Sequence, residues 1–427
     1  MMYKPHFQRL ESRRLLSAVY PTANEVYEVE LINRARANPS AEAARFGIAL
    51  NEGLPAGTIS TAPKQPLAIN RFITDGARKH SRWMIDNDLF QHEGVSGTDP
   101  GQRMTNAGYA FVMPFTWGEN IAYRSQKPSV PDPFTTAGQL HQDLFVDAGI
   151  EHRGHRTNML SSAFKEIGAG IVSGEFNTFN AVMLTTDFGA SGAGSFVTGV
   201  AYNDTLNANN FYTPGEGIGG LTITAKRIGD GATFTTTTFP GSGAYALKLT
   251  TAADYIVTAT GAGLSAPLRF ANVFVGSINV KRDFRPADAG IIRGNVFNDA
   301  NHNGTYDAGE GTPNVLVYID SHRDGRRNNG ELYSRTNADG AYRFTGLGPG
   351  VYRVRETQPD ATVLTTPAAG FYDVVLGAGR IVGGKSFANN AAPSMSSRAF
   401  ARSSNGYFQM HDDSEPDRPQ HLIDGLV

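Results

Sequence analysis

Apolar residues recur at helical spacing through the first part of the chain. Thr22 and Glu25, three residues apart, form the capping-box pattern of a helix start, and the helical pattern continues until Asn38-Pro39 ends it. A stronger amphipathic helix is predicted over residues 70–90, and another helical segment over residues 137–149. The side chains predicted to face the core from residues 70–90 are Phe72, Ile73, Ala77, Trp83 and Met84.

Two segments rich in β-branched residues follow these helices. Residues 166–174 and 179–189 are punctuated by glycine, a pattern typical of paired strands. Because the helices precede an antiparallel pair, the first part of the chain is predicted to be an α+β sandwich.

After Ala190 the pattern changes to short alternating strands separated by Gly, Asn and Asp. Two similar stretches begin at Gly199 and Gly294, and each leads into a strand, a turn and another strand. Their spacing of about a hundred residues is the size of one β-sandwich domain, so two all-β immunoglobulin-like sandwich modules are predicted. Residues 389–427 hold few apolar side chains and are predicted to form a disordered tail.

Composition and charge exclude several classes of protein. The 427 residues include no cysteine, which excludes disulfides and thiolate metal sites. The formal net charge of −2 gives no basic footprint, so no nucleic-acid partner is expected. No apolar stretch reaches membrane length, so no transmembrane segment is predicted.

One polar loop has the spacing of a twelve-residue calcium-binding loop, which supplies oxygen ligands from alternate positions and places glycine at the sixth. Residues 299–310 match this register, with Gly304 at the sixth position. The predicted ligands are Asp299, Asn301, Asn303, the Thr305 carbonyl, Asp307 and Glu310. Calcium is therefore predicted as a cofactor of the second β module.

Residues 320–331 repeat this register with a poorer donor set, because His322 stands at the third position. The weaker ligands predicted there are Asp320, Asp324, the Arg326 carbonyl, Asn328 and Glu331. The corresponding stretch of the first module, residues 204–216, is one residue longer and lacks the glycine, so it gives little reason to expect calcium.

The segments VFND, NHNG, DAGE and TNADGAYRFTGLGPGVYRV resemble the SdrD B-like family of bacterial surface modules, over residues 290–388. The resemblance implies a calcium-stiffened immunoglobulin-like sandwich that acts as a spacer. Residues 196–288 resemble a diverged SdrD B-like or carboxypeptidase-regulatory-like sandwich. In the leader, residues 1–21, the stretch 10–16 resembles the LEPR-XLL motif of bacterial surface proteins, which implies export.

Two histidines and two acids in the helical part are candidates for a polar site. They occur in the order His92, Glu119, Asp147 and His155. Imidazole suits a zinc-like ion, and a carboxylate often fixes the tautomer of such a ring. Spacing this wide, taken alone, is weak evidence for a metal site and is more typical of a hydrogen-bonded polar network. The string HEGVS lacks the second histidine of a zinc-peptidase motif, since Ser96 stands there.

Longer strings around these residues resemble the CAP family, also called SCP-like or cysteine-rich secretory protein, antigen 5 and pathogenesis-related 1. Within residues 22–190 they are KHSRWMIDNDLFQHEG, RMTNAGYAFVMPFTWGENIAY, LFVDAGIEHRGHRTNML and FKEIGAGIVSG. The resemblance implies an α-β-α sandwich whose central cleft holds His92, Glu119, Asp147 and His155. Many members carry glutamate where Asp147 stands, and aspartate reaches about 1.5 Å less far.

Three other histidines are not assigned to this site. His80 is expected to be packed or hydrogen-bonded in its helix, and His141 to be solvated on the surface of its helix. His152 is expected to be exposed in a loop.

Three functions fit these patterns. The favoured one is a secreted or surface-displayed bacterial protein that binds a small ligand, lipid or peptide in the cleft, with cell-envelope partners. The alternative is a metal-dependent, peptidase-like hydrolase in which His92 and His155 hold a zinc-like ion and Glu119 is the general base. The third is a purely structural surface protein. Two protein ligands make a loose site beside the usual three for catalytic zinc, so binding is favoured and enzymatic activity stays an open question.

Overall fold

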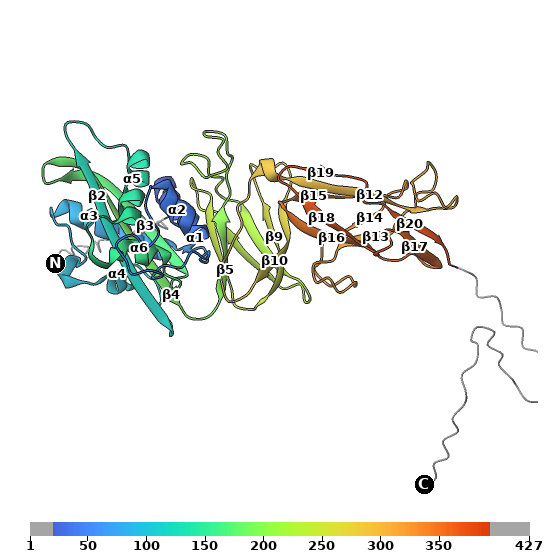
Figure 1. Ribbon diagram of the computed structural model, residues 1–427, viewed down its shortest axis with the longest axis horizontal. Helices are drawn as coiled ribbons and strands as arrows, with labels where there is room; N and C mark the ends of the chain where they lie inside the picture. Colours follow the sequence, from blue (N-terminus) through green and yellow to red (C-terminus); the bar gives the residue numbers. More distant parts are fainter. Residues whose placement is uncertain (1–19, 393–427) are drawn as a thin grey trace, which may run out of the picture.

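The computed structural model describes residues 20–392. These residues form three successive parts along one long axis, with the helices in the first part (Figure 1). The LEPR-XLL-like stretch, residues 10–16, lies outside the described residues, as does most of the predicted tail. No helix within residues 20–392 is long and apolar enough to cross a membrane.

The first part begins with the predicted helices. Thr22 and Glu25 form both bonds of the capping box at the start of α1 (Ala23–Ala37). Asn38 ends α1 and caps α2 (Pro39–Arg45), so the chain turns there rather than leaving helical structure. The remaining helices of this part are α3 (Arg71–Asp86), α4 (Pro100–Asn106), α5 (Pro133–Val146) and α6 (Gly154–Leu160).

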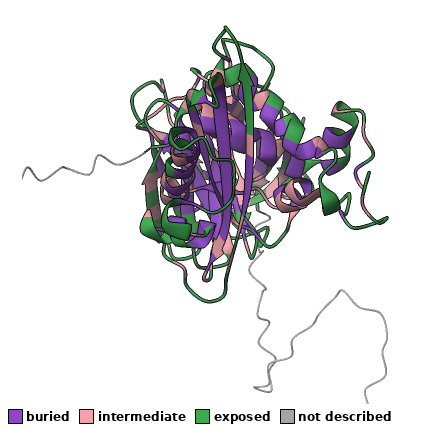
Figure 2. Ribbon diagram, turned by 90° about the vertical axis from the view of Figure 1, so that its left-hand side faces the viewer, coloured by how far each residue is buried: buried purple, intermediate pink, exposed green. Residues whose placement is uncertain are grey.

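Four strands form the central sheet in the order β1-β3-β4-β2. Their bounds are β1 (Ala68–Ile69), β2 (Phe115–Gln126), β3 (Glu166–Phe176) and β4 (Phe179–Ser191). The predicted pairing of the two late segments is confirmed, because β3 and β4 form an antiparallel hairpin around Phe176 and Phe179. The strands are buried at the centre, and exposed residues lie on the outer surfaces (Figure 2).

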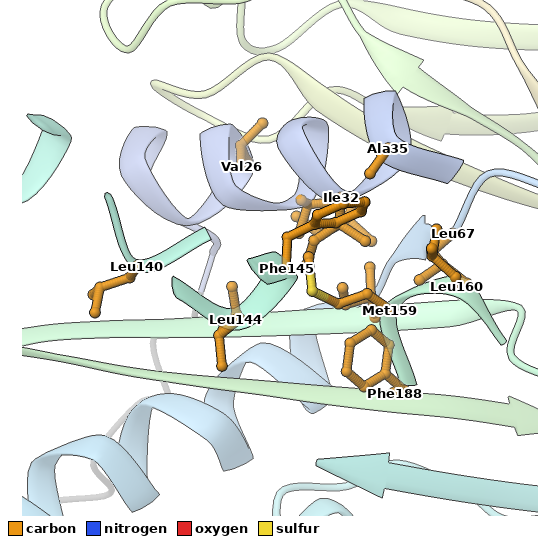
Figure 3. Packing of buried hydrophobic residues seen from close by; sticks show 14 of the residues in the cluster. Val26, Ile32, Ala35, Leu67, Leu140, Leu144, Phe145, Met159, Leu160 and Phe188 are labelled. Atoms are coloured by element: carbon orange, nitrogen blue, oxygen red, sulfur yellow. The ribbon is translucent and has the colours of Figure 1, made fainter. Parts of the chain in front are cut away.

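Helices cover both faces of this sheet, as an α-β-α sandwich requires. Helix α3 lies so close to β3 that a Cβ on Gly168 would stand 2.1 Å from the Thr74 nitrogen. Ile73, Ala77 and Met84 are buried as predicted, whereas Phe72 and Trp83 are half-buried. On the other face, side chains of α1 and α5 pack over the sheet around Phe188 (Figure 3).

Two β-sandwich modules follow. In the first, the sheet β11-β5-β8 faces strands β6, β7, β9 and β10 across a core that includes Tyr245, Tyr255 and Val257. The bounds are β5 (Ser195–Val200), β6 (Thr222–Arg227), β7 (Thr233–Thr237), β8 (Ala244–Leu249), β9 (Ala253–Thr260), β10 (Leu268–Val275) and β11 (Val280–Lys281).

In the second module the sheet β14-β13-β16-β18 faces β12, β15, β17, β19 and β20. The bounds are β12 (Gly290–Asn298), β13 (Leu316–Ile319), β14 (Tyr333–Arg335), β15 (Ala341–Leu347), β16 (Gly350–Glu356), β17 (Thr362–Thr366), β18 (Tyr372–Leu376), β19 (Ile381–Val382) and β20 (Phe387–Ala391). Strand β20 therefore continues past residue 389, where the tail was predicted to begin.

Specific contacts join the three parts. Asn279 donates from Nδ2 to the carbonyls of Pro66 and Lys165, at 2.9 and 2.7 Å, and Lys281 forms a 2.9 Å ion pair with Glu30. Further along, β10 and β15 are parallel neighbours through Arg269 and Leu347, so one sheet passes from the first module into the second.

Candidate functional site

The first half of the site joins His92, which follows α3, to Glu119 on β2. The Nδ1 atom of His92 lies 2.8 Å from Oε1 of Glu119. The other oxygen of Glu119 accepts a hydrogen bond from the buried guanidinium of Arg103 on α4. The His92 side chain is 56% exposed and that of Glu119 only 2%, so the ring faces solvent while the acid lies beneath it.

The second half joins Asp147, at the end of α5, to His155 on α6. Nδ1 of His155 lies 2.7 Å from Oδ1 of Asp147, whose other oxygen accepts from the His155 backbone N–H at 2.9 Å. Asp147 has left-handed backbone angles, φ 54° and ψ 38°. This turn brings α6 back onto the carboxylate, so the shorter aspartate reaches its histidine.

Two asparagines connect the halves. Asn158 donates from Nδ2 to Oδ1 of Asn120 at 2.9 Å and to the backbone carbonyl of Glu119 at 3.2 Å. Asn120 in turn donates to the backbone carbonyl of His155 at 3.1 Å. The strings GEN and GHRTN thus fix the two histidine–carboxylate pairs relative to each other. The predicted tetrad is brought into one region of the fold as two such pairs.

Charge around Glu119 is balanced by its neighbours. Burial opposes ionisation of Glu119, but the hydrogen bond from His92 and the charge of Arg103 outweigh it and hold the pKa of Glu119 below its usual value. Burial lowers the pKa of His80 to about 4, and its Nε2 lies 3.0 Å from the Gln91 carbonyl. The expectation that His80 is a packed, hydrogen-bonded residue is therefore confirmed.

The donor set suits a metal ion or a polar ligand, although a complete metal cage is absent. Both histidines turn Nδ1 towards a carboxylate, which leaves Nε2 as the atom that would meet a zinc-like ion. Within residues 20–392 there is no group of three or more His, Cys, Asp and Glu side chains arranged to hold a metal. Any ion bound by His92 and His155 would need further ligands from water or from a bound molecule.

The remaining histidines give one confirmation and one correction. His152 is confirmed as an exposed loop residue, with a side chain 84% exposed. The prediction for His141 is wrong, because this residue is fully buried between α5, α1 and α2. Its Nε2 lies 3.0 Å from Glu42, and its Nδ1 lies 3.6 Å from Glu28. Burial lowers the pKa of His141, but these two acids outweigh burial and raise it above its ordinary value.

Two hollows are lined in part by residues of α4, and none of the four tetrad residues lines either of them within the described part of the chain. One, of about 120 Å³, is lined by His80, Trp83 and Arg103 among others. The other, of about 270 Å³, is lined by α4 together with Phe111, Phe115 and Trp117. Arg103 was not predicted from the sequence to belong to this site. Its only signal was its place in the string RMTNAG, which carries no feature of an ion pair.

The predicted calcium loop, residues 299–310, is folded around its own oxygen atoms. Asp299 accepts from the backbone N–H of Asn303 and Gly304, and Asp307 accepts from the side-chain amides of Asn301 and Asn303. Gly304 has a φ of +72°, the left-handed angle that glycine adopts without strain. Carboxylate and amide oxygens are the donors that calcium prefers, so the residue types of this loop suit the ion, although its three acids are not gathered into one metal-holding group within residues 20–392.

The two related loops, residues 320–331 and 204–216, differ from residues 299–310 because an arginine lies beside the first aspartate of each. In residues 320–331, Asp320 forms a 2.7 Å ion pair with Arg355. In residues 204–216, Asp204 lies 3.4 Å from Arg285. Within residues 20–392 the carboxylates of residues 299–310 have no such cationic partner within 4.0 Å. An arginine beside the first ligand competes with a cation, so the fit is best at residues 299–310.

Comparisons with known proteins agree with this architecture. Residues 29–188 match the model of the cysteine-rich secretory protein family, and residues 291–375 match that of the SdrD B-like domain. A segment of 108 residues is 31% identical to the uncharacterized protein YkwD of Bacillus subtilis, covering 25% of this chain and 35% of that protein. The match thus spans about a third of this relative's length.

Two solved structures are also similar. An extracellular protein containing an SCP domain from Bacillus anthracis is 21% identical, with a TM-score of 0.23 over 38% of this chain and 40% of that one. GBS52, the minor pilin of Streptococcus agalactiae, is 15% identical, with a TM-score of 0.24 over 47% of this chain and 98% of that one.

Proposed function

We propose that this chain, which carries a CAP domain at residues 29–188 and an SdrD B-like domain at residues 291–375, is a bacterial protein secreted or displayed at the cell surface. Its CAP cleft binds a ligand or partner through the two histidine–carboxylate pairs. Its β modules act as a spacer that calcium stabilises. Lipid, peptide and small polar molecules are the ligand classes open to such a cleft.

The observation that carries this proposal is the way both oxygens of Glu119 are used. One faces Nδ1 of His92 and the other accepts from Arg103. A general base works best with a pKa near the working pH and access to the water it activates, whereas Glu119 is buried, hydrogen-bonded at both oxygens and has its pKa held low. The arrangement therefore favours fixed imidazoles that bind a ligand over a carboxylate that activates water.

The metal-dependent hydrolase is the competing function and depends on the same two histidines. A zinc-like ion on Nε2 of His92 and His155 would supply Lewis acidity, and Asp147 and Glu119 would orient the rings. Its weakness is the donor count, since catalytic zinc usually has three protein ligands.

Titration calorimetry of the full chain with zinc tests the cleft. We expect zinc-dependent heat in the wild type, loss of that heat in H92A/H155A, and no change in H152A, whose exposed ring serves as the control. Absence of heat in the wild type would refute metal binding and with it the hydrolase. Equal heat in wild type and double variant would place the metal elsewhere. Peptide and ester hydrolysis that needs zinc and disappears in E119Q would overturn the binding proposal in favour of the enzyme.

The calcium spacer is tested separately, by the effect of calcium on thermal unfolding. A wild-type chain that unfolds identically in calcium and in chelator would refute this part of the proposal. The cleft part would be unaffected, because its residues lie in another domain.

A further inference from the structure

A basic groove lies on the outer face of the second β module, far along the chain from the CAP cleft. It has a volume of about 620 Å³, and its floor is formed by β12 and β15. Three arginines line it, Arg293 on β12, Arg343 on β15 and Arg335 on β14. No aspartate or glutamate of residues 20–392 lines it. We call this the arginine groove.

The positions of two of these arginines destabilise the sheet. Arg293 and Arg343 stand directly opposite each other in the antiparallel ladder between β12 and β15, and cross-strand neighbours project to the same face. Both side chains are exposed, in alternation with the buried Ile292 and Phe344. Like charges in directly opposed positions destabilise a sheet.

The charge of these arginines is not balanced by the fold itself. Within residues 20–392, none of the three guanidinium groups lies within 4.0 Å of a carboxylate. Other arginines and lysines in the same part of the chain do form ion pairs with carboxylates, for example Arg355 with Asp320. Arg335 instead donates to the neutral carbonyl of Asn314 at 3.0 Å. An anion seated between Arg293 and Arg343 would relieve their repulsion.

We propose that the arginine groove binds an acidic polysaccharide, a linear glycan that carries carboxylates. The planar guanidinium group pairs with a carboxylate through two parallel hydrogen bonds, and two opposed arginines can hold one carboxylate between them. The rest of the lining includes Ser334, Asn295 and Asn337, whose hydroxyl and amide groups match the hydroxyls of sugar rings. The volume lies within the usual range of ligand sites.

The geometry favours a glycan over an acidic peptide. A peptide that binds as an added strand needs a free strand edge. β12 is paired on both sides, by β15 and by β19 and β20, and the free edges of β15 and β14 present their hydrogen-bonding groups in the plane of the sheets rather than on the face where Arg293 and Arg343 stand. The groove meets its ligand with side chains on a sheet face. Repeated carboxylates and hydroxyls suit such a surface better than a peptide backbone does.

The test measures binding of the full chain to polygalacturonate, a carboxylated glycan, by biolayer interferometry at about physiological ionic strength. Neutral dextran and polyglutamate are the comparison polymers. We expect R293Q/R343Q to weaken polygalacturonate binding at least about tenfold, since two charge-assisted contacts are lost. K226Q, which removes an exposed charge from the first module, is expected to leave binding unchanged.

A second readout keeps the test decisive if the variant binds poorly for another reason. Because R293Q/R343Q removes two like charges, its thermal unfolding temperature without glycan should be no lower than that of the wild type. Polygalacturonate should raise this temperature for the wild type alone. Equal binding by wild type and double variant would overturn the proposal, and so would equal losses in K226Q. Polyglutamate binding as tight as that of polygalacturonate, with the same dependence on Arg293 and Arg343, would replace the glycan by an acidic peptide.

Discussion

Asp187 on β4 stands directly opposite Glu119 on β2, and its carboxyl group is completely buried with neither oxygen hydrogen-bonded within the described part of the chain. Burial, together with the negative charge of Glu119, raises the pKa of Asp187 well above its usual value. The two acids therefore differ in their surroundings: Glu119 faces Arg103 and His92, whereas Asp187 is buried with no cation of residues 20–392 in contact, and their pKa values shift in opposite directions.

This difference predicts opposite effects of two conservative substitutions. D187N should leave the free energy of unfolding at pH 7 unchanged or raise it, because the buried site offers a carboxylate no contacting cation within the described residues and an amide carries no charge to desolvate. E119Q should lower it by about 3 kcal/mol, because Arg103 would remain as a buried charge without a partner. Urea unfolding followed by tryptophan fluorescence measures this domain selectively, since the two tryptophans, Trp83 and Trp117, both lie in it. A large loss in D187N would show that Asp187 is ionised in the native state.

The bridge between Asn158 and Asn120 predicts a coupling between the halves of the site. N158A should destabilise the CAP domain by about 1–2 kcal/mol, because the bonds to Glu119 and Asn120 are lost and Asn120 is fully buried. It should also weaken any ligand that contacts both histidines. N87A, which removes an exposed amide bonded within its own helix, is the control for fluorescence-monitored unfolding. Equal effects of N158A and N87A would show that the bridge contributes nothing.

The charge difference among the three loops predicts where calcium acts. At calcium about a hundredfold above the dissociation constant, the second module should gain about 3 kcal/mol and its calorimetric transition should rise by roughly 10 °C or more. D299A should remove most of this gain, whereas D204A should keep it, because Arg285 already lies beside Asp204. A gain that survives in D299A and disappears in D204A would assign calcium to the first module.

Glu356 at the end of β16 predicts a pH dependence of the second module. Its side-chain oxygens have no hydrogen-bond partner within the described residues, and burial raises its pKa from 4.5 to about 7, even though Asn389 lies beside it. The unfolded chain gives up this proton near pH 4.5 and the folded one near pH 7. Stability is therefore full below pH 4.5, falls between pH 4.5 and 7, and levels off above. The total loss is roughly 3 kcal/mol.

E356Q isolates this contribution from the other titrating groups. The difference in unfolding free energy between wild type and E356Q, measured by calorimetry from pH 4 to 8, should change mainly between pH 4.5 and 7. A difference that stays constant over this range would mean that Glu356 has an ordinary pKa in the folded protein.

Local signals in the sequence predicted much of this fold. The capping box at Thr22, the periodicity of α3 and the β-branched pair around residue 177 each depend on neighbours within a few positions. His141 could not be placed in the same way, because its partners Glu28 and Glu42 lie about a hundred residues earlier on other helices. Helical spacing alone does not reveal that a polar face is covered by two acids.

The site, too, could be predicted only in part. Strings that resemble a known family identified the four residues His92, Glu119, Asp147 and His155, but they did not show which histidine pairs with which acid. The left-handed turn at Asp147 that compensates for the shorter side chain depends on how α6 folds back. Arg103 was missed because its role exists only once α4 packs against β2.

The sheet that passes from β10 into β15 has a mechanical consequence. A pull along the long axis of Figure 1 must cross the junction between the modules, where the backbone N–H of Gly348 donates to Arg269 at 2.7 Å and that of Gly229 donates to Asn329 at 2.8 Å. Among residues 20–392, one residue pair, Arg269 with Leu347, joins the two strands in register. The shared sheet stiffens the junction against bending, yet the junction has far fewer backbone hydrogen bonds than either module. We expect tension along this axis to open the junction first, while both sandwiches stay folded.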